Sequence, residues 1–108
     1  METNIYELIK VIWHGGMSDY AETKSLGFYA NKEKAIEDAK IDGKERGIDE
    51  RWIYLADDYK RAITLTGRKL VVNNYLYKRC KGNEAELLDA MAWTIGTGYL
   101  IKKVDIKK

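Results

Sequence analysis

The feature that most constrains the fold of this sequence is the run of residues 4–14 (NIYELIKVIWH), which is rich in β-branched and aromatic side chains. These residue types favour a strand. Successive strand residues point to opposite faces, and here both faces are mostly apolar, with Ile9 and Val11 on one and Leu8 and Ile12 on the other. We therefore expect an interior strand of a sheet that is covered on both sides.

A second strand and a helix are predicted directly after the first strand. Residues 25–30 (SLGFYA) have strand character and should pair antiparallel with the first strand across a polar loop over 15–24. Residues 31–47 then predict a helix, with Asn31 as its N-cap and Gly47 just beyond its end. Its apolar stripe is thin, so this helix should lie on the surface of the sheet.

Residues 51–56 (RWIYLA) are compatible with two structures. As a helix, they would align Trp52, Leu55 and Ala56 on one face with apolar residues further on. As a strand, they would pair with the next segment across a turn at 57–58. The density of aromatic and β-branched residues favours the strand.

The sequence Thr66-Gly67-Arg68-Lys69 is the clearest local signal for a hairpin. Glycine stands at the first central position of a two-residue loop, as a type II′ turn requires. Folding about this turn predicts three cross-strand pairs: Leu65 with Leu70, Ile63 with Val72, and Thr64 with Val71. A second tight turn at Asn73-Asn74 would make residues 75–79 a third strand; otherwise one strand runs on from Lys69 to Lys78.

A second helix and a last strand complete the chain. Asn83 predicts the N-cap, and residues 85–95 (AELLDAMAWTI) are apolar around most of the helix circumference, so this helix should be deeply buried. Glycines at 96 and 98 end it, and residues 99–106 predict a strand. The expected fold class is α+β: one domain over residues 1–108, with a single mainly antiparallel sheet and two helices in the order ββα-βββ-αβ.

Charge is unevenly distributed along the chain. Residues 1–58 carry 8 basic and 13 acidic side chains, whereas residues 59–108 carry 11 basic and 4 acidic ones. The segment 59–82 contains seven bases and no acid. Such asymmetry indicates an anionic partner, either nucleic acid or an acidic protein surface.

Tyrosines lie between these bases, and cations that neutralise phosphates beside rings that stack on bases are typical of single-strand binders. The predicted binding residues are Lys60, Arg61, Arg68, Lys69, Tyr75, Tyr77, Lys78, Arg79 and Lys81. Two structural explanations compete with this one. Basic residues on an edge hairpin also prevent edge-to-edge aggregation, and they could pair with the acidic half of the same chain or of another copy.

The sequence offers no suitable set of residues for catalysis or for metal binding. His14 is the only histidine and Cys80 the only cysteine, so a zinc site is not expected, and Ser18 and Asp19 beside His14 do not by themselves make a triad. We expect no enzyme activity and no cofactor. A single cysteine fits a reducing compartment, and no signal peptide or membrane-spanning run is evident, so a cytoplasmic location without membrane association is predicted.

The stretch GFYANKEKAIEDA (27–39), a strand that leads directly into a Lys/Glu-rich helix, resembles small accessory proteins of bacteria and their phages. This resemblance covers about an eighth of the chain. It implies binding to a host macromolecule, as inhibitors of host defence systems such as anti-CRISPR proteins do.

The leading hypothesis is a non-enzymatic binding or inhibitory module that engages nucleic acid, or a host protein that handles nucleic acid, through the basic segment 59–82. One alternative is a binder of an anionic small molecule such as a nucleotide. Another is a structural homo-oligomer in which the acidic half of one copy meets the basic half of the next.

Overall fold

The computed structural model describes residues 4–14, 20–57, 60–81 and 83–105. Its elements are β1 (Asn4–His14), β2 (Tyr20–Tyr29), α1 (Lys32–Arg46), the 3₁₀ turn η1 (Glu50–Trp52), β3 (Ile53–Ala56), β4 (Arg61–Thr64), β5 (Lys69–Val71), α2 (Asn74–Cys80), α3 (Glu84–Ile95) and β6 (Gly98–Asp105). The predicted α+β class is confirmed. The order differs from ββα-βββ-αβ by one additional helix, α2, which lies between β5 and α3.

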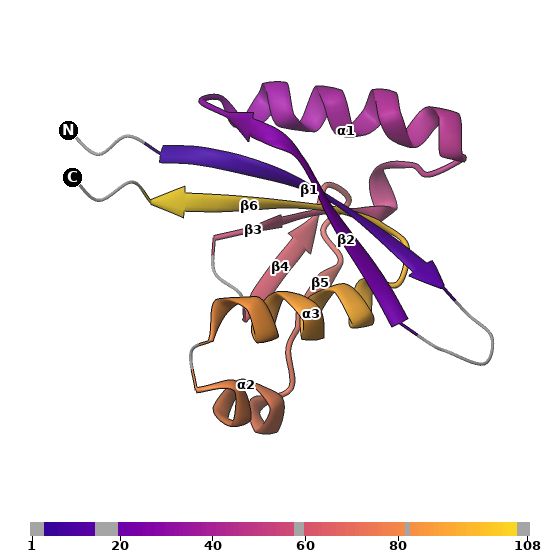
Figure 1. Ribbon diagram of the computed structural model, residues 1–108. Coiled ribbons are helices and arrows are strands. Elements are labelled where there is room, and N and C mark those ends of the chain that lie inside the picture. The colour runs from indigo at the N-terminus through magenta and orange to yellow at the C-terminus, as the bar shows by residue number, and fades with distance from the viewer. Residues whose placement is uncertain (1–3, 15–19, 58–59, 82, 106–108) are drawn as a thin grey trace.

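The six strands form one mixed sheet in the order β2-β1-β6-β3-β4-β5. All neighbouring pairs are antiparallel except β3 and β6, which are parallel. The last strand of the chain thus lies between the β1–β2 hairpin and the three strands β3 to β5 (Figure 1). Its consecutive residues Tyr99, Leu100 and Ile101 are all buried, because this central strand is covered on both faces.

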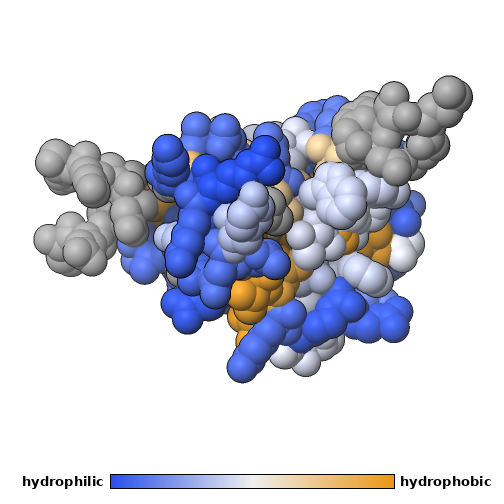
Figure 2. Space-filling model, turned by 90° about the horizontal axis from the view of Figure 1, so that it is seen from below, coloured by the Kyte–Doolittle hydropathy of each residue, from blue (hydrophilic) through white to orange (hydrophobic). Residues whose placement is uncertain are grey.

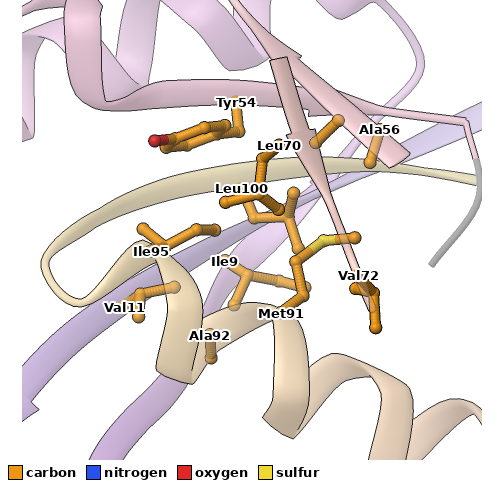
Figure 3. Close-up of a cluster of buried hydrophobic side chains, with 11 residues drawn as sticks. Ile9, Val11, Tyr54, Ala56, Leu70, Val72, Met91, Ala92, Ile95 and Leu100 are labelled. Carbon is orange, nitrogen blue, oxygen red and sulfur yellow. The ribbon is translucent and has the colours of Figure 1, made fainter. Parts of the chain in front are cut away.

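Helices cover both faces of the sheet: α1 lies above it, and α3 and α2 lie below it in the view of Figure 1. The alternation of β1 divides the core accordingly. Leu8 faces the cluster that contains Ala35 and Ala39 of α1, whereas Ile9 and Val11 face the cluster that contains residues of α3 (Figure 3). The three β1 side chains are at most 2% exposed, which confirms the predicted interior strand.

β2 is longer than predicted. It begins at Tyr20, because residues 20–24, expected in a loop, continue the antiparallel pairing with β1 as far as His14. The register shifts between Leu8 and Ile9, where one additional residue of β2, Leu26, forms a bulge.

The first helix matches its predicted boundaries. The side chain of Asn31 accepts a hydrogen bond from the backbone N–H of Lys34 at 3.2 Å, and Gly47 ends the helix with a left-handed φ of 72°. Only the small residues Ala35, Ala39 and Gly43 are fully buried on α1. The predicted thin stripe and surface position are therefore confirmed.

Polar contacts supplement this thin apolar stripe. The Tyr29 hydroxyl donates to the Asp38 carboxylate at 2.7 Å, and the hydroxyl of buried Tyr99 donates to Asp42. Asp42 also pairs with Lys10, with 3.2 Å between Nζ and Oδ2. The hydrogen bond from Tyr99, assisted by Lys10, holds the pKa of Asp42 below its ordinary value.

We expect the two tyrosines at this contact to ionise late. The hydrogen bond to Asp38 raises the pKa of Tyr29 to about 12, and burial raises that of Tyr99 to about 12. Unfolded tyrosine titrates near pH 10. Their contribution to stability is therefore complete below about pH 10 and is lost as the pH rises towards about 12, because the unfolded chain releases these protons first.

Ultraviolet absorbance checks this expectation. At about pH 11 the native protein should show less tyrosinate than the urea-unfolded chain, and Tyr99→Phe should remove one group from the late step. Equal tyrosinate in the native and unfolded samples would contradict it.

In the middle of the chain, the strand interpretation of residues 51–56 is largely confirmed. η1 covers residues 50–52, and β3 follows from Ile53 with Ile53, Tyr54 and Ala56 buried. The competing helix interpretation is wrong, because β3 pairs with both β4 and β6.

The predicted register of the β4–β5 hairpin is wrong. Ala62, not Leu65, pairs with Leu70, and Ile63 pairs with Lys69. The loop is longer than two residues: the N–H of Gly67 donates to the carbonyl of Thr64 at 3.0 Å, and Gly67 has a φ of 94°. The observed pairing is offset from the predicted one by an odd number of residues, so each β4 side chain lies on the opposite face of the sheet from the one predicted. Ile63 therefore points away from the side of the sheet that buries Leu70.

Two further predictions are also corrected. Residues 75–79 are not a strand: they lie in α2, whose N-cap Asn73 accepts a hydrogen bond from the N–H of Tyr75 at 2.7 Å. The N-cap of α3 at Asn83 is confirmed, but this helix is not buried all round. Trp93 is 59% exposed, because only the stripe through Leu87 and Met91 faces the sheet.

Candidate functional site

The nine predicted binding residues do not form one surface. The first group belongs to α2 and the chain beside it, the second lies on an uncovered face of β4 and β5, and the third is a single arginine in the hairpin loop. In that order the groups are Lys60, Tyr75, Tyr77, Lys78, Arg79 and Lys81; Arg61 and Lys69; and Arg68.

We call the first group the α2 surface. The carbonyl of Lys60 accepts a hydrogen bond from the N–H of Val72 at 2.8 Å, so the start of β4 lies beside the chain that leads into α2. As a result the Lys60 ammonium sits 4.9 Å from the centroid of the Tyr77 ring, within cation–π range. Lys81 ends α2 in the left-handed conformation, with a φ of 51°.

The side chains of the α2 surface are accessible. Tyr75 is 71% exposed and Tyr77 38% exposed, and Lys78 and Arg79 are also exposed. Among the described residues, no ion pair within 4.0 Å engages Lys78, Arg79 or Lys81. Figure 2, seen from the side of α2 and α3, shows hydrophilic side chains over much of this face around a smaller apolar patch.

Acidic residues border the α2 surface on one side. Arg79 and Cys80 line a depression of about 300 Å³ together with Glu86 and Asp89 of α3. These carboxylates disfavour an anionic ligand at that border. An anion is therefore better accommodated on the part of α2 that lies away from this border.

The second group lies on the face of the sheet that α1 leaves open. α1 packs on β1, β2 and β6 and does not extend over β4 and β5. Arg61 and Lys69 line a depression of about 390 Å³ whose floor includes Ile63 and Val71. Ile63 is 42% exposed and Val71 58% exposed, so this open sheet face combines two cations with an apolar floor, and Asp57 adds one carboxylate to the lining.

Arg68 has a structural role. Its guanidinium lies 4.5 Å from the centroid of the Trp52 ring. Its Nη2 donates to the Tyr54 hydroxyl at 2.6 Å and to the carbonyl of Arg51 at 3.1 Å. Arg68 thereby links the hairpin loop to η1 and β3, away from the α2 surface.

Sequence reasoning missed a third feature, a groove of about 490 Å³ lined by all three tryptophans of the chain. Trp13 comes from β1, Trp52 from η1 and Trp93 from α3. No sequence motif joins residues so far apart. The one local signal was a tryptophan on α3 at a position that the sheet does not cover.

The other side chains considered for catalysis or metal binding do not come together within the described residues. His14 pairs with Glu22, with 2.8 Å between Nε2 and Oε2, while Ser18 and Asp19 lie outside the described residues. Within residues 4–14, 20–57, 60–81 and 83–105, no three His, Cys, Asp or Glu side chains gather as metal ligands. No helix in the same ranges is long and apolar enough to cross a membrane.

By its fold, the chain is an α+β protein with a six-stranded mixed sheet and helices on both faces. In the part of the chain that the structure describes, the surface carries two separate basic areas and one aromatic groove. No family model, no curated protein and no solved structure matches it.

Proposed function

We propose that this chain is a non-enzymatic binding module that engages single-stranded nucleic acid through the α2 surface. The observation that carries the proposal is the 71% exposed ring of Tyr75 on a helix that also presents Lys78 and Arg79. An exposed aromatic ring can stack on a base, while neighbouring cations neutralise the phosphates on either side.

The Lys60–Tyr77 contact supports this proposal. Because the ammonium lies over the ring, both side chains are held in place before a ligand arrives, which reduces the conformational entropy lost on binding. The acidic border at Glu86 and Asp89 repels phosphates, so we expect the nucleic-acid strand to lie along α2 and to avoid α3. The strand would then pass Tyr75 and Lys78, which lie one turn apart on α2.

The cytoplasm is the proposed location, on the ground of the single cysteine. The host of a phage is the proposed setting, on the ground of the resemblance of residues 27–39. In the host cell, the protein bound to nucleic acid would inhibit a host process that acts on the same nucleic acid.

The test is binding of a fluorescently labelled single-stranded oligonucleotide, measured by anisotropy over a series of salt concentrations. Tyr75→Ala should weaken binding about tenfold or more, because stacking on a base contributes roughly 1–3 kcal/mol. The double variant Lys78→Ala/Arg79→Ala should reduce the slope of log K against log salt by about 0.7 for each phosphate that it no longer neutralises.

The matched control is Arg61→Ala/Lys69→Ala, which removes the same number of charges from the open sheet face. This control should keep most of the affinity. Equal losses in the two double variants would show a response to net charge alone, and absence of binding at low salt would refute the proposal. Binding to an acidic host protein in place of the oligonucleotide would also overturn it, in favour of the other predicted partner.

The open sheet face favours a second candidate function, the binding of a small anionic ligand such as a nucleotide. Arg61 and Lys69 border a depression of about 390 Å³, within the usual range for small-molecule sites. A thermal-shift panel of nucleotides should then raise the melting temperature of the native protein but not that of Arg61→Ala/Lys69→Ala. A homo-oligomer stays a prediction, and light scattering at low salt would reveal it.

A further inference from the structure

The groove that contains the tryptophans is assembled from three stretches of the chain: Trp13, residues 47–52 and residues 93–97. Its walls are Trp13 at the end of β1, Trp52 in η1, and Trp93 on α3; Ile48 follows α1, and the chain between α3 and β6 completes the lining. Trp93 is 59% exposed, although its ring is among the most costly to leave in water. An exposed indole that lines one groove with two others is a feature that folding by itself does not require.

The walls are held in fixed positions. The Trp13 and Trp93 rings meet edge to face, with centroids 5.4 Å apart and planes at 85°. The backbone N–H of Trp13 donates to Thr97 Oγ1 at 3.3 Å. Trp52 is held from outside by the Arg68 guanidinium, 4.5 Å from its ring centroid. The groove is therefore formed before any ligand enters.

The lining also limits the charge of an occupant. No charged side chain lines the groove within the described residues, and its surface is mainly apolar. A charged group placed against these side chains would lose part of its hydration without gaining a partner. A cation is further disfavoured because the Trp52 ring already interacts with the charge of Arg68.

We propose that this groove binds a small molecule through an uncharged planar aromatic ring, held against the indoles that line it. The volume of about 490 Å³ lies within the range of small-molecule sites. Indole rings offer both faces and edges, so a planar ring can stack on one of them while the edge of another contacts it. This site is independent of the α2 surface, since its lining shares no residue with that surface.

Intrinsic fluorescence of the native protein tests the proposal, because every tryptophan of the chain lines the groove. Caffeine is the probe: it is uncharged and planar, and it absorbs little where tryptophan is excited selectively. Titration should quench the emission along a saturable curve. Trp93→Ala should weaken the affinity about tenfold or more, measured by calorimetry so that the missing fluorophore does not matter.

Two controls separate the proposed site from weaker explanations. Cyclohexanol, a smaller uncharged ring without π electrons, should neither saturate the quenching nor displace caffeine. Tyr75→Ala, which alters the α2 surface, should bind caffeine as tightly as the unmodified protein. This variant also distinguishes the two sites, because failure of oligonucleotide binding leaves the caffeine result unaffected, and the reverse also holds.

Three outcomes would overturn the proposal. Quenching that is linear and equal in native and urea-unfolded protein would be collisional. Unchanged affinity in Trp93→Ala would place the probe elsewhere. Displacement of caffeine by cyclohexanol at similar concentrations would show a general apolar surface in place of an aromatic-ring site.

Discussion

Gly98→Ala should lower the free energy of unfolding by about 3 kcal/mol, the upper end of the usual cost of overpacking a close contact. A Cβ at this position would overlap the carbonyl oxygen of Trp52, far inside van der Waals contact. Neither backbone can yield easily. Gly98 begins the central strand β6, where it pairs with Val11, and the next residue, Tyr99, pairs with Ile53.

The same substitution should disturb the tryptophan groove. Relief of the overlap displaces Trp52, and the added Cβ also lies 3.3 Å from a methyl carbon of Ile95, another lining residue. We expect denaturant unfolding to show the loss of stability and tryptophan emission to shift in the folded variant. A folded Gly98→Ala with unchanged stability would contradict the close approach of these two backbones.

Gly47→Ala is the matched control for Gly98→Ala. A Cβ at Gly47 meets no atom within 4 Å, but its φ of 72° is unfavourable for alanine. This variant should therefore lose about 1 kcal/mol through backbone strain alone. Because Gly98 has no positive φ, its loss of stability reports the steric overlap, whereas that of Gly47 reports backbone strain.

Met91→Ala should lower the free energy of unfolding by about 3 kcal/mol, within the range for buried large-to-small substitutions. Met91 is fully buried on α3, at the centre of the cluster on this face of the sheet. Figure 3 shows it beneath Leu100 and between Ile9 and Val72. Its removal leaves a cavity between α3 and the sheet. The hydrogen-bonded strands cannot move inward to fill this cavity.

Trp93→Ala provides the comparison on the same helix. It deletes a larger side chain, yet Trp93 is 59% exposed and its ring contact is with Trp13. We expect a loss of about 1 kcal/mol, roughly that of one aromatic pair. If Trp93→Ala cost more than Met91→Ala in chemical denaturation, the side of α3 assigned to the core would be wrong.

The locally encoded features of this protein were predictable. Asn31 and Asn83 cap their helices because an Asn side chain satisfies free backbone N–H groups within the same turn. Gly47 ends α1 because glycine adopts the left-handed conformation at little cost. The strand β1 was recognisable as interior because both of its faces are apolar.

The errors lie where local patterns compete with distant contacts. Tyr75 and Tyr77 alternate as in a strand, but Asn73 caps a helix there and the ladder with β4 ends at Val71. In the hairpin, Gly67 suits more than one turn type, and the register was decided by which residues the core buries: Leu70 and Ala62.

For the candidate sites, the sequence by itself determined the composition, and the tertiary structure decided the grouping. The segment 59–82 is basic and acid-free whatever its fold, but its nine candidates divide among α2, the open sheet face and the Arg68 contact. The tryptophan groove joins positions 13, 52 and 93 only because β6 brings β1, β3 and α3 together. Caps, turns and strand character depend on neighbours within a few residues, so they can be recognised in the sequence. Surfaces depend on strand order and register, which are set by burial across the whole chain.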